Sequence, residues 1–143
     1  MSNSVVIIDY GAGNLMSVQN ALDSLRVSWA VSADPAVVRS AKRLIFPGVG
    51  SFGAMMERLR KRKLEQPIKD AIASGTPFLG LCLGLQVLFE RSEESPGVAG
   101  LGIFKGDVVK FKKGKVPQVG WNEVKPNSGN KTIIGPMWAY FVN

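Results

Sequence analysis

Short apolar runs alternate with helical patterns along the first 91 residues, and this alternation constrains the fold more than any other feature of the chain. The first run, residues 5–8, is apolar and β-branched throughout, which is typical of a strand buried on both faces. Strands are predicted at residues 5–8, 28–31, 44–46 and 78–81, and helices at residues 15–25, 54–59, 68–74 and 85–91, with a further helix starting at Asp34 and Pro35. Such alternation predicts an α/β fold built on a mostly parallel, doubly wound sheet.

The pattern changes after about residue 105. Short strands in an antiparallel style are predicted at residues 107–111, 121–124 and 137–142, with turns at residues 112–114 and 127–130. The last of these strands is apolar, and no helical pattern follows to cover it. We therefore expect one domain over residues 1–143, incomplete at its C-terminus, whose final strand is an exposed edge that favours aggregation.

The single cysteine lies between a predicted strand and a predicted helix. Residues 80–84 read Gly-Leu-Cys-Leu-Gly, which is the pattern of a nucleophile elbow with sulfur in place of oxygen. Backbone amides at the start of a helix stabilise a thiolate, and the Leu83 N–H is well placed to bind an oxyanion. A buried structural cysteine is the alternative interpretation. The strand, turn and helix around Cys82 favour the nucleophile.

Two further loops follow the carboxyl ends of predicted strands, where the ligand sites of parallel sheets lie. In residues 47–50, Pro-Gly-Val-Gly, the glycines allow a peptide to rotate, so that the N–H of Gly48 or Val49 becomes a second oxyanion donor. The loop at residues 9–14 has only two of the three glycines of a dinucleotide-binding fingerprint. A tight turn is the favoured interpretation, with Asn14 either capping the next helix or facing a partner protein.

The composition of the chain limits which partners and cofactors it is expected to bind. The net charge of +7 is concentrated at residues 58–63 and 105–115, but Glu57 and Glu65 bracket the first cluster, which indicates a solvated helix face rather than a nucleic-acid surface. No apolar run reaches the length of a membrane helix, and a single cysteine favours a reducing, cytoplasmic location. We predict no metal site and no cofactor.

The chain contains no histidine, so the general base of a cysteine hydrolase is missing, lies on another chain or is not needed.

The chain resembles the glutamine amidotransferase subunit of imidazole glycerol phosphate synthase, within the class I glutamine amidotransferases and their flavodoxin-like fold. Four stretches carry the resemblance in the family's order: residues 7–15 (IIDYGAGNL), 46–53 (FPGVGSFG), 79–86 (LGLCLGLQ) and 116–122 (VPQVGWN). The elbow alone would fit any class I glutamine amidotransferase, and the first and last stretches narrow the choice.

The resemblance implies roles for individual residues. Cys82 would attack the carboxamide of L-glutamine, releasing ammonia and leaving a γ-glutamyl thioester for water to cleave. The oxyanion would be bound by the backbone amide of Gly48 or Val49 and by that of Leu83. The glutamine would be held by Gly50, Gly80, Gly84 and Gln86. Asn14 and Trp121 would face the partner protein. That partner would be a (β/α)8-barrel cyclase, in a heterodimer that makes imidazole glycerol phosphate for histidine biosynthesis. The family's catalytic His and Glu lie in a later stretch that this chain does not match. We therefore expect the 143 residues by themselves to hydrolyse glutamine very poorly.

Two other functions remain open. A non-catalytic interaction module would keep the elbow fold without a base. An amidotransferase subunit of another synthase, such as a pyridoxal or anthranilate enzyme, would share the elbow but not the cyclase. A nucleic-acid binder is the least favoured interpretation, because aromatic residues do not interleave with the first basic cluster.

Overall fold

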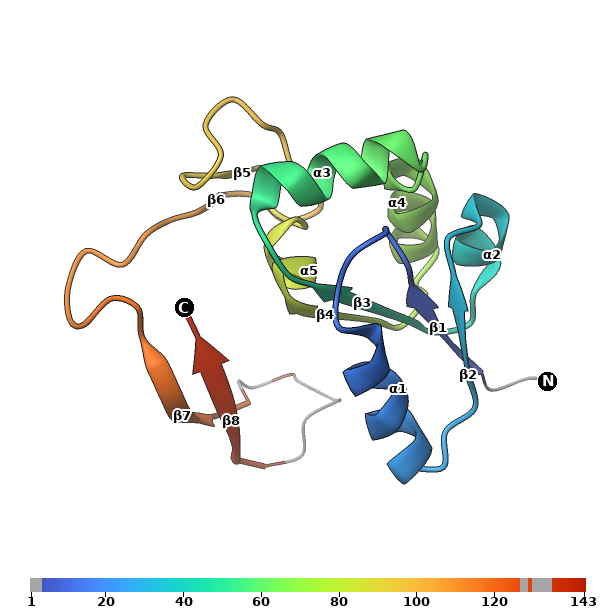
Figure 1. The fold of residues 1–143 in the computed structure, drawn as a ribbon, viewed down its shortest axis with the longest axis horizontal. Helices are drawn as coiled ribbons and strands as arrows, with labels where there is room; N and C mark the ends of the chain where they lie inside the picture. Colours follow the sequence, from blue (N-terminus) through green and yellow to red (C-terminus); the bar gives the residue numbers. More distant parts are fainter. Residues whose placement is uncertain (1–3, 127–128, 130–134) are drawn as a thin grey trace. The chain divides into compact units, whose positions relative to one another are not determined.

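The computed structural model describes residues 4–126, 129 and 135–143, which divide into two compact units, Met1–Val109 and Lys110–Asn143. A four-stranded parallel sheet forms the centre of the first unit (Figure 1), with strand order β2-β1-β3-β4. Its strands are β1 (Val5–Ile8), β2 (Trp29–Ser32), β3 (Leu44–Gly48) and β4 (Phe78–Cys82). The predicted α/β fold with a mostly parallel sheet is confirmed.

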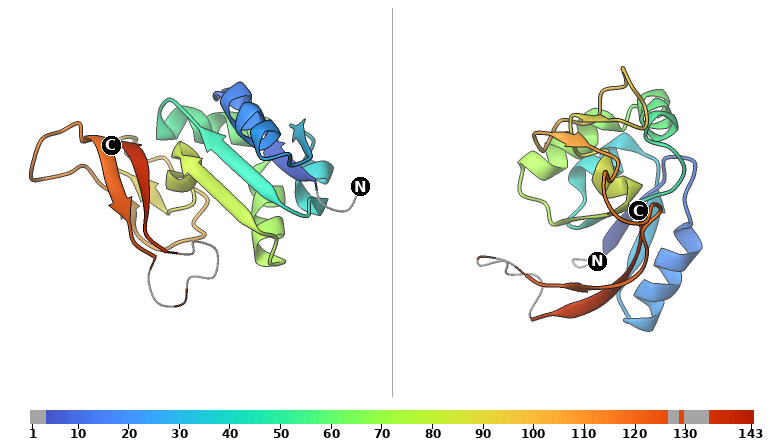
Figure 2. Two further views of the ribbon diagram at one scale, coloured as in Figure 1. Left: turned by 90° about the horizontal axis from the view of Figure 1, so that it is seen from below. Right: turned by 90° about the vertical axis from the view of Figure 1, so that its left-hand side faces the viewer.

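Helices cover both faces of this sheet, α1 on one side and α3 and α4 on the other (Figures 1 and 2). The helices are α1 (Leu15–Ser24), α2 (Pro35–Ser40), α3 (Phe52–Lys61), α4 (Glu65–Ala73) and α5 (Leu83–Gln86). Three of them start at capping side chains: Asn14 accepts from Ser17 N–H, Asp34 from Ala36 N–H and Ser51 from Ala54 N–H. The predicted start of α2 at Asp34 and Pro35 is confirmed.

The core lies in two layers because alternate residues of a strand point to opposite faces. Val6 and Ile8 of β1 pack into the larger layer, together with buried residues of α2, α3, α4 and α5. Val5 and Ile7 pack into the smaller layer against Leu22 of α1. The strand is therefore buried on both faces, as predicted from its continuous apolar run.

The predicted helix at residues 85–91 is wrong. Helix α5 ends at Gln86, and the Val87 carbonyl accepts a hydrogen bond from Leu101 N–H at 2.8 Å instead of continuing the helix. The chain then forms the two-residue strand β5 (Arg91–Ser92). Leu101 therefore occupies the Val87 carbonyl, which would accept a hydrogen bond within the helix if α5 were longer.

Two smaller predictions also need correction. β3 does not stop at Phe46 but continues through Pro47 and Gly48, which pair with β4. Proline is tolerated there because the pairing of β3 with β1 ends at Ile45, so only one neighbouring ladder remains. Leu25, the last residue of the helix predicted at residues 15–25, is instead the C-cap of α1 and is 70% exposed.

The later strands follow the predicted positions in part. The strand expected at residues 107–111 is only β6 (Asp107–Val108), and it pairs parallel to β5 rather than antiparallel. In the second unit, β7 (Val119–Val124) and β8 (Met137–Val142) form the predicted antiparallel pair. The turn predicted at residues 127–130 lies, except for residue 129, outside the described residues. None of the helices in the described ranges has the length and apolar character that crossing a membrane requires.

Candidate active site: a cysteine at a strained elbow

The chain turns sharply at Cys82, between β4 and α5. Cys82 is the last residue of β4 and the N-cap of α5, with φ 53° and ψ −117°. A side chain other than glycine rarely adopts this backbone, and the strain costs about 1–3 kcal/mol where the surrounding fold enforces it. The residue is exposed and makes no disulfide. The predicted nucleophile elbow is therefore present in its geometry, and the buried structural cysteine is ruled out.

Three glycines bring the elbow close to the neighbouring strand. A Cβ atom on Gly84 would overlap the carbonyl oxygen of Phe46 in β3. A Cβ on Gly48 would lie 2.8 Å from the Leu83 carbonyl carbon, and one on Gly80 would lie 2.9 Å from the Leu85 Cα. Each contact is closer than real Cβ atoms tolerate. The glycines predicted to hold substrate therefore also have a packing role, because α5 rests directly on the backbone of the sheet.

Helix α5 is too short to contribute a large dipole. It has four residues, so few peptide dipoles sum along it. The Leu83 N–H is at the first position of α5, where no intrahelical acceptor exists. The Leu83 side chain is buried in the larger core layer and fixes this amide beside Cys82. This arrangement supports the prediction of Leu83 as an oxyanion donor.

The loop after β3 presents a different arrangement. Val49 N–H donates a hydrogen bond to the Tyr10 hydroxyl oxygen at 3.0 Å, and that hydroxyl donates to the Val49 carbonyl at 3.3 Å. The Val49 amide is therefore occupied by a side chain of the protein. Gly50 has φ 94°, a conformation that favours glycine, and a Cβ there would meet nothing within 4 Å. The glycine-rich loop is thus sterically open to rotation at Gly50.

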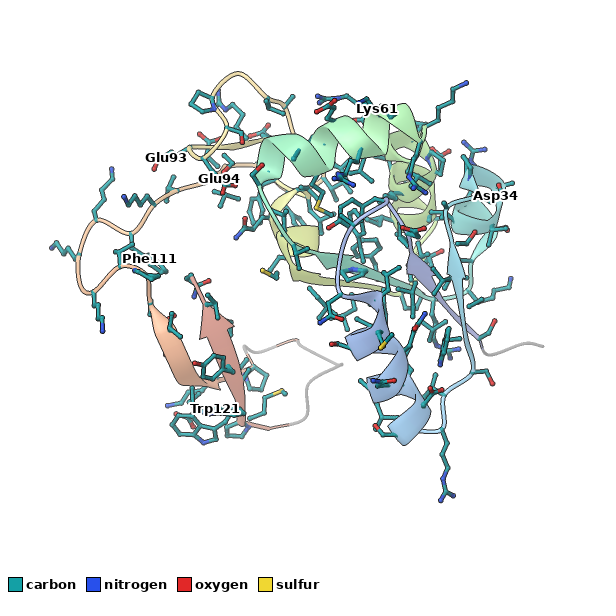
Figure 3. The ribbon with its side chains drawn as sticks, viewed as in Figure 1. Asp34, Lys61, Glu93, Glu94, Phe111 and Trp121 are labelled. Atoms are coloured by element: carbon teal, nitrogen blue, oxygen red, sulfur yellow. The ribbon has the colours of Figure 1, made fainter. Side chains whose placement is uncertain are left out.

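The start of α3, directly after this loop, is fixed by Glu94 and Ser95, which belong to none of the motifs in the sequence. Phe52 N–H donates to Glu94 Oε2 at 2.8 Å, and Gly53 N–H donates to Ser95 Oγ at 2.9 Å. Figure 3 shows Glu94 beside the first turn of α3. These partners are 42 residues apart in sequence, so no local pattern signals them. They anchor the loop at its C-terminal end.

The basic cluster on α3 is partly engaged with the loop at residues 9–14. Glu57, one of the two glutamates that bracket this cluster, forms an ion pair with Lys61 at 2.7 Å. The Arg58 guanidinium, however, donates to the Gly11 carbonyl, and Arg62 lies 3.6 Å from the Asp9 carboxylate. Both arginines remain exposed, in agreement with the solvated-face interpretation, and they also hold the first loop against α3.

The remaining predicted site residues are distributed over both units. Asn14 is exposed and caps α1, accepting from Ser17 N–H at 3.2 Å. Gln86 is half-buried at the end of α5. In the second unit, Trp121 is 66% exposed and its ring packs edge-on against Tyr140 at 5.6 Å between centroids. Figure 3 shows Trp121 on β7.

Cys82 has no histidine to serve as its base, and no metal centre is found among the described residues. The sequence has no histidine, and no group of three or more Cys, Asp or Glu side chains in the described ranges is arranged to hold a metal ion. A surface hollow of about 420 Å³ is lined in part by Asp23, Arg26 and Trp29. Trp29 starts β2, so this hollow is at the amino edge of the sheet, opposite the edge that carries Cys82. The hollow is therefore not the cysteine site.

Comparison with known proteins agrees with this geometry. The family model for "Glutamine amidotransferase class-I" matches residues 6–134. A solved structure described as "Crystal structure of glutamine amidotransferase" superimposes with a TM-score of 0.75 at 18% identity, over 96% of this chain and 70% of that one, which shows a shared fold. The chain belongs to the class-I glutamine amidotransferase family.

Comparison with individual relatives indicates to which group within this family the chain is most similar. The chain is 45% identical to the imidazole glycerol phosphate synthase subunit HisH of Symbiobacterium thermophilum, over 96% of this chain and 66% of the relative. It is 46% identical to the HisH subunit of Rhodopirellula baltica, over 97% of this chain and 70% of the relative. A third HisH subunit, from Thermococcus kodakarensis, is 48% identical over 84% of this chain and 58% of the relative. Within its family the chain thus groups with HisH subunits, and it spans about two thirds of their length.

Proposed function

We propose that the chain is the glutaminase subunit of an imidazole glycerol phosphate synthase, with both units forming one glutamine amidotransferase domain in the cytoplasm. The observation that carries this proposal is Cys82 at the strained elbow, exposed and followed directly by the Leu83 amide. Identity above 40% to several HisH subunits supports the choice of synthase. The family model extends across both units, which supports a single domain.

The proposed reaction has two covalent steps. The Cys82 sulfur attacks the carboxamide carbon of L-glutamine, and the Leu83 amide with that of Gly48 or Val49 stabilises the oxyanion. The carbon–nitrogen bond breaks, the thiol proton passes to the leaving nitrogen, and ammonia departs. Water then cleaves the γ-glutamyl thioester, returning the thiol and releasing glutamate. In this proposal Gly50, Gly80, Gly84 and Gln86 line the space that holds the glutamine.

We propose that the proton transfers depend on a histidine base, which these residues do not contain. The sequence has no histidine, and a positioned base contributes about 10²–10⁴-fold to such reactions. We therefore propose that the 143 residues alone hydrolyse glutamine very slowly.

The proposed partner is a (β/α)8-barrel cyclase that receives the ammonia. Asn14 and Trp121 are proposed to face it, and the exposure of both side chains supports this. Exposed tryptophans are frequent anchors of protein interfaces.

The test is a glutamate assay with the chain and a barrel cyclase, with Cys82→Ser as the matched variant. We expect slow glutamate formation that Cys82→Ser abolishes. Equal glutamate formation by both forms would refute Cys82 as the nucleophile. Turnover near that of a full-length HisH subunit would refute the proposed need for an additional base.

A non-catalytic interaction module is the second candidate, favoured by the absence of histidine from the sequence. A glutamine analogue that carries an electrophile distinguishes the two functions. The enzyme is expected to be modified at Cys82 and protected by L-glutamine, whereas an interaction module would react slowly and without protection. Co-purification with a barrel cyclase, rather than with another synthase, separates the proposed subunit from other amidotransferases.

A further inference from the structure

We propose that the Tyr10 hydroxyl holds the Val49 peptide in an orientation that withholds its N–H from the oxyanion, and that this contact must open during glutamine hydrolysis. The inference rests on the proposed function and takes Val49, rather than Gly48, as the second oxyanion donor. It assigns Tyr10 a positioning role that slows the enzyme in its resting state.

The hydroxyl engages both polar groups of one residue. It accepts from Val49 N–H at 3.0 Å and donates to Val49 C=O at 3.3 Å. An N–H group makes one good hydrogen bond at a time, so the Val49 amide binds either Tyr10 or an oxyanion. The neighbouring Gly48 pairs with Cys82 in the sheet, which puts this contact next to the nucleophile.

The position of the hydroxyl is set by the core. The Tyr10 side chain is 1% exposed, and its ring lies edge-on against Phe46 at 5.9 Å between centroids. A Cβ on Gly13 would lie 3.7 Å from the Tyr10 hydroxyl, so the first loop also packs around it. The ring therefore cannot leave without disturbing the core, and opening the contact requires the Val49 peptide to move.

Helix α3 provides a second connection, besides Tyr10, between the loop at residues 9–14 and the loop at residues 47–50. Arg58 of α3 donates to the Gly11 carbonyl of the first loop. The same helix begins at Phe52, shortly after Val49 in the chain. Both ends of the Tyr10–Val49 contact are therefore tied to one rigid element, and the hydroxyl links the first loop directly to the Val49 peptide.

Amide hydrogen exchange at Val49 tests the contact itself. Tyr10→Phe keeps the ring and removes the hydroxyl, and we expect exchange at Val49 to become about fivefold faster, which is the equivalent of one net hydrogen bond. Tyr140→Phe, on the exposed face of β8, is the matched control and should leave this rate unchanged. An unchanged rate at Val49 in Tyr10→Phe would overturn the proposal.

Steady-state glutaminase kinetics of the chain with its barrel cyclase test the consequence. We expect Tyr10→Phe to raise kcat about fivefold with little change in KM, because the resting contact is lost while substrate binding is not. A lower or unchanged kcat of Tyr10→Phe, with faster exchange at Val49, would overturn the inhibitory role.

Failure of the proposed function gives a different result. If the wild-type complex forms no Cys82-dependent glutamate, the proposed function and the kinetic role of Tyr10 both fall. The exchange rate at Val49 would still report whether the hydroxyl holds the peptide.

Discussion

The strained backbone at Cys82 reverses the usual effect of glycine on stability. We compare Cys82→Gly with Cys82→Ala, which both remove the thiol and differ by one methyl group. In an ordinary strand, glycine is less stable than alanine by about 0.5–1 kcal/mol. At φ 53° and ψ −117° the Cβ atom itself is unfavourable, and its removal recovers about 1–3 kcal/mol.

Taking about 2 kcal/mol of relieved strain against about 1 kcal/mol of chain entropy, Cys82→Gly should be about 1 kcal/mol more stable than Cys82→Ala. For a chain of this size the difference corresponds to about 4 °C in Tm. Thermal and urea unfolding followed by circular dichroism measure it. Lys63, with φ 55° just after the C-cap of α3, is the positive control, because Lys63→Gly should also be more stable than Lys63→Ala there. If Cys82→Gly is the less stable variant while the control behaves as expected, the elbow is not strained and the reasoning fails.

Other contacts predict the effects of three further changes. Gly84→Ala places a methyl group on the Phe46 carbonyl and should destabilise the chain by about 3 kcal/mol, whereas Gly75→Ala, with open space around it, should cost about 1 kcal/mol, both measured by urea unfolding. Hydrogen bonds from Gln66 and Arg39 lower the pKa of Asp70 below its ordinary value. These bonds therefore stabilise the fold fully at a pH above the ordinary pKa, and the stabilisation is lost as the pH falls through the lowered pKa. In acid titrations, the stability of Asp70→Asn should depend less on pH than that of the wild type. Trp121→Ala should weaken binding to the cyclase about 30-fold in calorimetry, and an unchanged affinity would remove Trp121 from the interface.

Most of the parallel sheet was predictable because its signals are local. β1 is apolar and β-branched at each of its four residues, and the start of α2 is marked by adjacent Asp34 and Pro35. The elbow was predictable for the same reason, since Gly80, Cys82 and Gly84 stand together in one short stretch.

The features that local patterns missed depend on residues far apart in sequence. Helix α5 stops early because Leu101 takes the carbonyl of Val87. The Tyr10–Val49 contact joins residues 39 positions apart. Such contacts exist only once the sheet has brought the loops together, so the sequence pattern at either end carries no sign of them.

The central claim is that the folded chain activates Cys82 toward a glutamine-like electrophile. The most direct measurement is the rate of covalent modification by a glutamine analogue bearing an electrophile, followed by intact mass, for the folded chain and for the chain unfolded in urea. Cys82 is the only cysteine, so the adduct reports one site. The account predicts modification at least about tenfold faster in the folded chain, slowed by L-glutamine. Equal rates in the folded and unfolded chains, or a rate that L-glutamine does not change, would contradict it.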